Sequence, residues 1–242
     1  MAKYVVRYGA MRILGVFTAP SSASYGRDTR VIVRTERGLE VAVVLWEGDE
    51  PSLAALKDST EGQILRKMTV EDEHELVRIA EQARRELDLC QTFVDQLGLE
   101  MKLVELERIF GGERVVVYYL SESRVDFREL VRLLAGELRI RIEMRQIGVR
   151  DEAKLLADYG DCGKQTCCNS HLVQMPPVSM RMAKMQKATL DPTKISGRCG
   201  RLKCCLRYEF ELYEQQELPL VQLDDGQLVR PSVALEADDS EP

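Results

Sequence analysis

The sequence predicts an α+β protein, in which a small N-terminal β-barrel-like module precedes an α-β-β-α-β domain with a Cys-rich loop region. Three observations support this fold class. Val- and Ile-rich segments dominate residues 3–46, a long apolar heptad pattern occupies residues 69–97, and six of the seven cysteines lie within residues 160–205. The chain has 242 residues, 45% of them hydrophobic and 31% charged, which is enough for one large or two small domains.

Composition shifts along the chain predict five segments. They are a small β-module over 1–50, a polar linker over 51–68, an α+β domain with two cysteine turns over 69–210, a C-terminal hairpin over 211–235 and a disordered acidic tail over 236–242. Residues 209–242 contain ten acidic side chains and one basic side chain. The rest of the chain is slightly positive, so the net charge of −6 does not exclude a nucleic-acid partner.

Four short segments rich in Val and Ile predict the strands of the N-terminal module. They cover residues 3–8, 11–17, 29–35 and 39–46, with turn signals at Gly9, in the stretch from Pro20 to Gly26, and at Arg37-Gly38. Small barrels often bind partners, although a role in folding and docking explains the pattern equally well.

A long helix is predicted from the N-cap Thr69 to about residue 97, with Gly98 ending it. Its apolar residues alternate by four and three positions and form a heptad seam: Leu76, Ala80, Ala83, Leu87, Cys90, Val94 and Leu97. Cys90 lies on this seam, far in sequence from the other cysteines. We therefore interpret Cys90 as a core side chain and not as a ligand.

The next segments complete the helix–strand order. Residues 101–110 and 114–120 form a predicted hairpin around Gly111-Gly112, and Asp126 with Glu129 predicts a capping box for a helix that reaches about residue 138. Residues 139–146 alternate between apolar and charged side chains, as a half-buried strand does. A short helix over 151–158 then leads to the first cysteine turn.

The segment from 160 to 205 contains one cysteine pattern twice. Residues 160–168 and 197–205 both read G-x-C-G-[K/R]-x-x-C-C, and each matched residue lies 37 positions from its counterpart. No secretory signal begins the chain, so we expect a cytoplasmic protein, in which structural disulfides are rare and cysteine clusters are metal-binding or catalytic. The C-x4-C-C spacing differs from the C-x-x-C of thioredoxin-type sites, which makes a thiol-dependent redox enzyme a weaker alternative.

Thiolates bind soft metals, and four of them suit either tetrahedral zinc or an iron–sulfur cluster. The minimal predicted ligand set is Cys162 and Cys199 with one cysteine from each adjacent pair, because neighbours in extended backbone point to opposite faces. Residues 180–208 carry eight basic side chains and one acid, so we expect the thiols to ionise readily. The same basic residues leave a zinc-stabilised RNA-binding module as an alternative function.

The region after the first turn is predicted to contain short elements. Pro176-Pro177 and Ser179 can start a helix that Asp191-Pro192 ends, residues 206–213 form a helix or strand, and residues 221–234 form the hairpin. The only histidines, His74 and His171, are interpreted as surface or structural residues, with His171 close enough to the first turn to be an occasional ligand. The sequence contains no convincing hydrolase or transferase constellation.

Three strings of residues carry a family resemblance. Residues 124–130 read RVDFREL, residues 141–154 read RIEMRQIGVRDEAK, and residues 194–197 read KISG directly before the second cysteine turn. Together with both turns, they resemble the bacterial YaaT/RicT family, whose shared domain is the PSP C-terminal homology region. The resemblance covers residues 69–210.

The resemblance implies a cytoplasmic regulatory subunit without enzymatic activity. Such subunits assemble with two small helical partners in a RicA/RicF-like complex that carries [4Fe-4S] clusters. That complex associates with the endoribonuclease RNase Y, promotes mRNA processing and influences sporulation. Carried over by motif position, the implied cofactor and metal ligands are Cys162, Cys167, Cys168, Cys199, Cys204 and Cys205.

Overall fold

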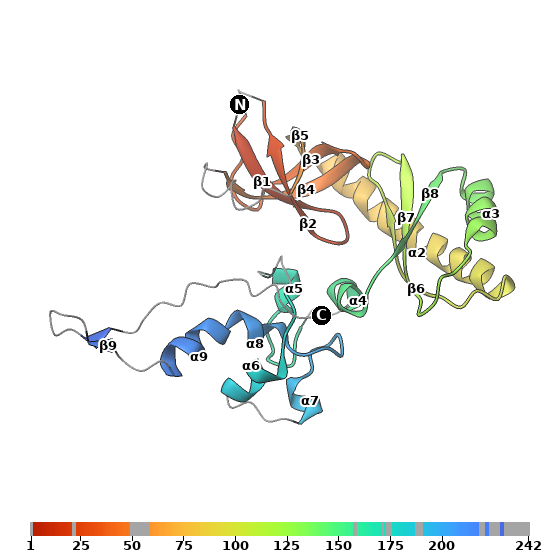
Figure 1. Ribbon diagram of the computed structural model, residues 1–242. Helices are drawn as coiled ribbons and strands as arrows, with labels where there is room; N and C mark the ends of the chain where they lie inside the picture. The colour runs from red at the N-terminus through yellow and green to blue at the C-terminus, as the bar shows by residue number, and fades with distance from the viewer. Residues whose placement is uncertain are drawn as a thin grey trace. The chain divides into compact units, whose positions relative to one another are not determined.

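The computed structural model places most of the chain in defined elements (Figure 1). It describes residues 2–20, 23–48, 59–156, 159–170, 172, 176–186, 191–217, 221–222 and 228–229. The chain divides into two compact units, residues 1–156 and residues 157–242. The predicted tail, 236–242, and His171 lie outside the described residues.

The N-terminal module is a closed barrel, which confirms the predicted architecture. Its strands are β1 (Lys3–Tyr8), β2 (Ile13–Thr18), β3 (Arg30–Thr35), β4 (Gly38–Glu47) and β5 (Thr60–Lys67), arranged in the order β1-β2-β5-β3-β4. The β2–β5 pair is parallel and the other pairs are antiparallel. Alternate side chains of these strands fill the interior, as the strand period requires. They include Tyr4, Tyr8, Phe17, Val33, Val44 and Ile64.

Strand β5 corrects the prediction of a linker over residues 51–68, because residues 60–67 close the barrel. Its sequence is polar, and Ile64 is its only buried side chain. Gly62 lets the strand approach the core closely, since an added Cβ would lie 2.4 Å from the ring of Phe17 and 2.5 Å from the carbonyl oxygen of Arg34. Tertiary pairing with β2 and β3 makes this segment a strand, and a local sequence pattern does not reveal such pairing.

The long helix α2 (Val70–Gln96) begins and ends where the sequence predicts. The hydroxyl of Thr69 accepts a hydrogen bond from the Asp72 N–H, and the Asp72 carboxylate accepts one from the Thr69 N–H, which together form a capping box. Gly98 follows the helix with a φ of +61°. Cys90 is fully buried, which confirms its interpretation as a core side chain.

A three-stranded sheet completes the first unit in the predicted order. β6 (Lys102–Arg108) pairs antiparallel with β7 (Arg114–Leu120), and β7 pairs parallel with β8 (Arg141–Gln146). The connection from β7 to β8 runs through α3 (Arg128–Leu138), and α4 (Val149–Leu156) follows β8. The chain therefore contains the predicted α-β-β-α-β series.

Both faces of this sheet are buried. On one face, Leu106, Val115 and Val117 pack with Cys90 and Val94 of α2 and with side chains of α3. On the other face, Val104, Val116 and Tyr118 pack with Met11, which follows β1 of the barrel. The barrel, the sheet and the two helices thus share contacts within residues 1–156.

The predicted capping box of α3 is wrong. The N-cap is Phe127, whose side chain makes no capping hydrogen bond. Asp126 instead binds the Arg128 N–H at 3.2 Å and the Arg128 guanidinium, with 2.9 Å between Arg128 Nε and Asp126 Oδ1. An arginine two residues away competes successfully for the carboxylate that would have capped the helix.

The second unit consists of short elements. They are α5 (Cys167–Ser170), α6 (Met180–Met185), α7 (Pro192–Ile195), α8 (Cys204–Tyr208) and α9 (Phe210–Glu217), with β9 (Val221–Gln222) paired antiparallel to β10 (Leu228–Val229). Met182, Ala183, Leu206 and Phe210 are its buried apolar side chains around α6, α8 and α9.

Two predictions for the second unit change. Asp191-Pro192 begins a helix and does not end one, because the Asp191 carboxylate accepts from the Thr193 N–H at 3.0 Å and proline suits the first helical position. Residues 211–217 belong to α9, so only the later part of the predicted hairpin segment pairs as strands. Among the described residues, no helix combines the length and the apolar character needed to cross a membrane.

Candidate metal centre in the two cysteine turns

The two cysteine turns have the same backbone structure. An isolated antiparallel bridge joins Tyr159 to Gln165 in the first turn, and its counterpart joins Ser196 to Leu202 in the second. In each turn, the N–H of the first glycine of the pattern donates to the carbonyl oxygen of the fifth residue. Gly160 N lies 2.8 Å from Lys164 O, and Gly197 N lies 2.8 Å from Arg201 O. The repeat in the sequence is therefore a repeat in the structure.

A glycine in the left-handed region reverses the chain in each turn. Gly163 has a φ of +74° and Gly200 a φ of +72°, a conformation that side chains with a Cβ rarely adopt. The first cysteine of each turn lies close to the glycine that begins the pattern. A Cβ added to Gly160 would lie 3.6 Å from Cys162 Sγ, and a Cβ added to Gly197 would lie 3.9 Å from Cys199 Sγ.

Each turn leads into a short helix whose first two residues are the adjacent cysteines. Cys167 and Cys168 begin α5, and Cys204 and Cys205 begin α8. The prediction assumed extended backbone, in which neighbours point to opposite faces. In a helix neighbours are about 100° apart, because a turn contains about 3.6 residues, so two adjacent side chains can approach one site.

Four cysteines from the two turns converge. The thiol of Cys167 is in hydrogen-bond contact with Cys204, and Cys205 and Cys162 are close enough to act on it electrostatically. Cys162 is exposed, the other three are half-buried, and none forms a disulfide. The two turns, separated by 37 positions in the sequence, therefore contribute to one cluster of thiols, which we call the four-thiol cluster: Cys162, Cys167, Cys204 and Cys205.

The environment raises the pKa of two of these thiols, Cys167 and Cys205. Burial is the first cause of the rise in the Cys167 pKa to about 12, followed by the proximity of Cys204, Cys205 and Cys162. Burial also raises the pKa of Cys205, with Glu209 and Cys204 adding to the effect, while Lys203 opposes it. The expectation that the basic surroundings make all six thiols ionise readily is therefore wrong for Cys167 and Cys205, because burial and neighbouring thiols outweigh the basic residues.

The remaining predicted ligands, Cys168 and Cys199, are half-buried at the equivalent turns. Among the described residues, no three Cys, His, Asp or Glu side chains stand close enough together to hold a single metal ion without moving. The four-thiol cluster as it stands therefore does not meet the requirements of a single-ion site.

Asp161 joins the two turns and was missed by sequence reasoning. Its carboxylate lies 3.3 Å from Arg198 Nε and 3.6 Å from Lys203 Nζ, both in the second turn. Asp161 and Arg198 occupy the same position of the repeated pattern, 37 residues apart. The sequence could have revealed this pair, because the x of G-x-C-G is acidic in the first turn and basic in the second.

Comparisons with known proteins agree with this architecture. Residues 62–147 match the family model described as the PSP1 C-terminal conserved region, and residues 177–219 match the PSP1-like protein, third domain. The chain is 43% identical over 219 residues to the stage 0 sporulation protein YaaT of Bacillus subtilis (strain 168), covering 87% of this chain and 75% of that protein.

A second relative shares only part of the chain. An uncharacterized protein of Schizosaccharomyces pombe is 33% identical over 82 residues, which cover 34% of this chain and 11% of that protein. No solved structure matches the chain.

Proposed function

Because this chain belongs to the YaaT family of proteins with a PSP1 C-terminal region, we propose that it is a regulatory scaffold subunit without enzymatic activity, which binds or shares a [4Fe-4S] cluster. We further propose that it acts in the cytoplasm with small helical partners of the RicA/RicF type on mRNA processing by RNase Y. A role in developmental regulation would agree with the name of the Bacillus relative.

The observation that carries the cluster proposal is the convergence of thiols from both turns. The donor set fits the group chemically, because iron–sulfur clusters are held by four cysteine thiolates. Cys162, Cys167, Cys204 and Cys205 would hold it, with Cys168 and Cys199 as further candidates.

The protein's own residues prepare the site. The left-handed glycines close each turn, and the bridges hold the ends of each turn together. Asp161 pairs with Arg198 and Lys203 across the turns, which offsets part of the basic charge beside the thiols. When bound, an iron–sulfur cluster supplies a group that gains or loses an electron, and we propose that its redox state controls docking of the partners.

The first experiment measures iron, zinc and acid-labile sulfide in full-length protein purified without oxygen, alone and co-expressed with the partners. Iron with sulfide is expected in the wild type, and Cys167→Ser and Cys204→Ser should each lose most of both. Cys90→Ala is the matched control, because Cys90 is buried in the other unit and should leave both contents unchanged.

Other results of this measurement decide against the cluster. Stoichiometric zinc without sulfide would identify the alternative, a zinc-stabilised RNA-binding module, since four thiolates also suit tetrahedral zinc. Wild-type protein without iron or zinc under all conditions would overturn both forms of the proposal.

The scaffold proposal has a separate experiment. The double variant Cys162→Ser/Cys199→Ser should fail to co-purify with the helical partners and with RNase Y, whereas Cys90→Ala should retain them. Normal co-purification of the double variant would show that the cluster does not control docking.

A further inference from the structure

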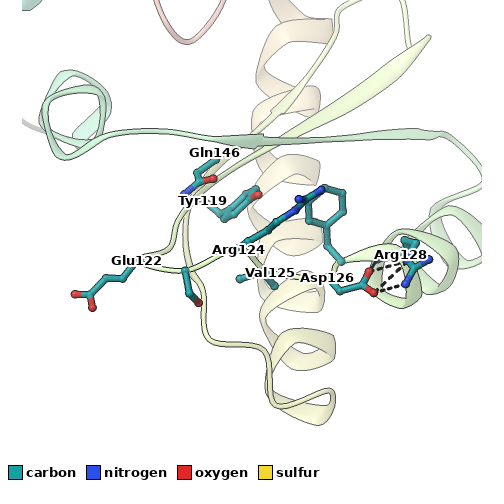
Figure 2. Close-up of a pocket in the computed structure, with 9 residues that line it drawn as sticks. Tyr119, Glu122, Arg124, Val125, Asp126, Arg128 and Gln146 are labelled. Carbon is teal, nitrogen blue, oxygen red and sulfur yellow. Dashed lines mark hydrogen bonds and ion pairs between the residues drawn. The ribbon is translucent and has the colours of Figure 1, made fainter.

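A cavity lies at the carboxyl ends of the two parallel strands of the sheet (Figure 2). Tyr119 near the end of β7 and Gln146 at the end of β8 are register partners, and both line it. The loop from Glu122 to Phe127, which connects β7 to α3, and Arg128 at the start of α3 form the rest of the wall. Open sheets with parallel strands and helical crossovers bind ligands at this edge. The volume of about 830 Å³ is within the range of small-molecule sites.

Two cations, Arg124 and Arg128, line this cavity. Arg128 is held by Asp126 through the hydrogen bonds described above. These bonds, with a smaller electrostatic contribution from Arg124, lower the Asp126 pKa to about 2. That carboxylate is therefore ionised but already matched by a guanidinium. Figure 2 shows Arg124 among the side chains that line the cavity, with Glu122 pointing away from them. Guanidinium groups bind phosphate or carboxylate groups through two parallel hydrogen bonds.

The cavity also offers a flat apolar surface and an amide. The rings of Tyr119 and Phe127 stand edge to face, with centroids 6.1 Å apart and planes at 63°. Tyr119 is almost completely buried, whereas Phe127 is half-buried and presents surface to the cavity. Gln146 Nε2 donates to the carbonyl oxygen of Ser121 at 3.0 Å, which fixes the amide and leaves its oxygen free to accept from a ligand.

These groups together recognise a ligand that has an anionic group, a planar ring and a polar ring edge. We infer that the cavity binds a nucleotide, with the phosphate on Arg124, the base against Phe127 and the edge of the base at Gln146. The nucleotide can be free or part of a single-stranded RNA, since both present the same phosphate and base. No lining residue is a cysteine, so this site does not depend on the proposed iron–sulfur cluster.

The test uses full-length protein and measures binding of AMP, UMP, inorganic phosphate and a fluorescein-labelled ten-nucleotide single-stranded RNA by calorimetry and fluorescence anisotropy. Nucleotides or the RNA should bind more tightly than phosphate. Arg124→Gln should weaken this binding about tenfold or more, as loss of a hydrogen bond to a charged group does. Arg132→Gln is the matched control, because Arg132 is an exposed arginine of α3 outside the cavity, and it should change affinity less than about twofold.

A second variant isolates the contribution of the ring. Phe127→Leu keeps an apolar side chain but removes the flat surface, so nucleotide binding should fall about fivefold or more while phosphate binding stays unchanged. Tighter binding of the RNA than of either mononucleotide identifies RNA as the source of the ligand, and the reverse order identifies a free nucleotide. The inference is overturned if no nucleotide or RNA binds, if phosphate binds equally well, or if Arg124→Gln and Arg132→Gln have the same effect.

Discussion

The guanidinium of Arg37 lies between two buried carboxylates, those of Glu40 and Glu107. Arg37 Nη1 is 2.7 Å from Glu107 Oε2, and Arg37 Nη2 forms an ion pair with Glu40. The side chains of Glu40 and Glu107 are only 4% and 11% exposed. Glu107 also accepts from the Ala10 N–H and the Tyr118 hydroxyl, so this network joins the barrel to the sheet.

We expect Arg37→Leu to lower the free energy of unfolding by about 3–5 kcal/mol, because it leaves two buried carboxylates without a cation. Urea denaturation of the variants measures this. Arg78→Leu is the control, since the side chain of Arg78 is 76% exposed in its ion pair with Glu75 and should cost only about 0–1 kcal/mol. Equal losses for the two variants would contradict the importance of burial.

The same network predicts a dependence of stability on pH. Burial alone would raise the pKa of Glu107, but hydrogen bonds from Arg37 and Tyr118 outweigh it and lower the pKa below its ordinary value of 4.5. A carboxylate with a lowered pKa stabilises the folded state above its unfolded pKa, and this contribution is lost as the pH falls through the folded pKa. Glu107→Gln should therefore flatten the loss of stability below pH 4.5 in acid denaturation curves. An unchanged acid slope would show that other carboxylates dominate.

At the scale of single residues, the sequence predicted which side chains belong to the candidate site better than it predicted their contacts and burial. The repeated pattern identified the cysteines as a group, and Cys162, Cys167, Cys204 and Cys205 do converge. The raised thiol pKa values could not be predicted, because they depend on burial and on which thiols meet in space. The cross-turn pairs of Asp161 are also tertiary contacts that no spacing rule describes.

At two glycines, the surrounding elements decide whether a substitution by alanine lowers or raises the free energy of unfolding. Gly62→Ala should lower the free energy of unfolding by about 1–3 kcal/mol, because the added Cβ overlaps the Phe17 ring and the backbone of Arg34 in the barrel. Gly136→Ala should raise it by about 0.5–1 kcal/mol, because this position in α3 has open space and alanine favours the helix. Thermal and urea unfolding of both variants measure the signs, and the same sign for both would contradict the described packing.

Elements with strong local signals were predicted well, and those fixed by tertiary pairing were not. The helix from Thr69 to Gly98 has a cap at each end and an apolar seam, and the structure confirms it. Strand β5 has one buried side chain and polar neighbours, so only its pairing with β2 and β3 reveals it. The capping of α3 was mispredicted because Arg128 competes for Asp126.

The whole molecule consists of two compact units, and all six turn cysteines are in the second. We therefore expect Cys167→Ser/Cys204→Ser to increase hydrogen exchange in α5 and α8 of the full chain by about tenfold or more, because metal binding and local order are coupled. Exchange in β6, β7 and α2 should stay within about twofold of the wild type, because their core lies in the other unit. Mass spectrometry resolves these segments, and equal acceleration in both units would show that they unfold as one.

The opposite charges of Asp161 and Arg198 have a consequence for how copies of this chain meet. Pairing a turn with its unlike counterpart brings these charges together, as the structure shows at 3.3 Å. Two identical first turns would place aspartate against aspartate, and two identical second turns would place arginine against arginine, which is unfavourable in each case. The residue between the first glycine and the first cysteine of each turn thus disfavours the pairing of two identical turns from neighbouring molecules, because their charges would repel.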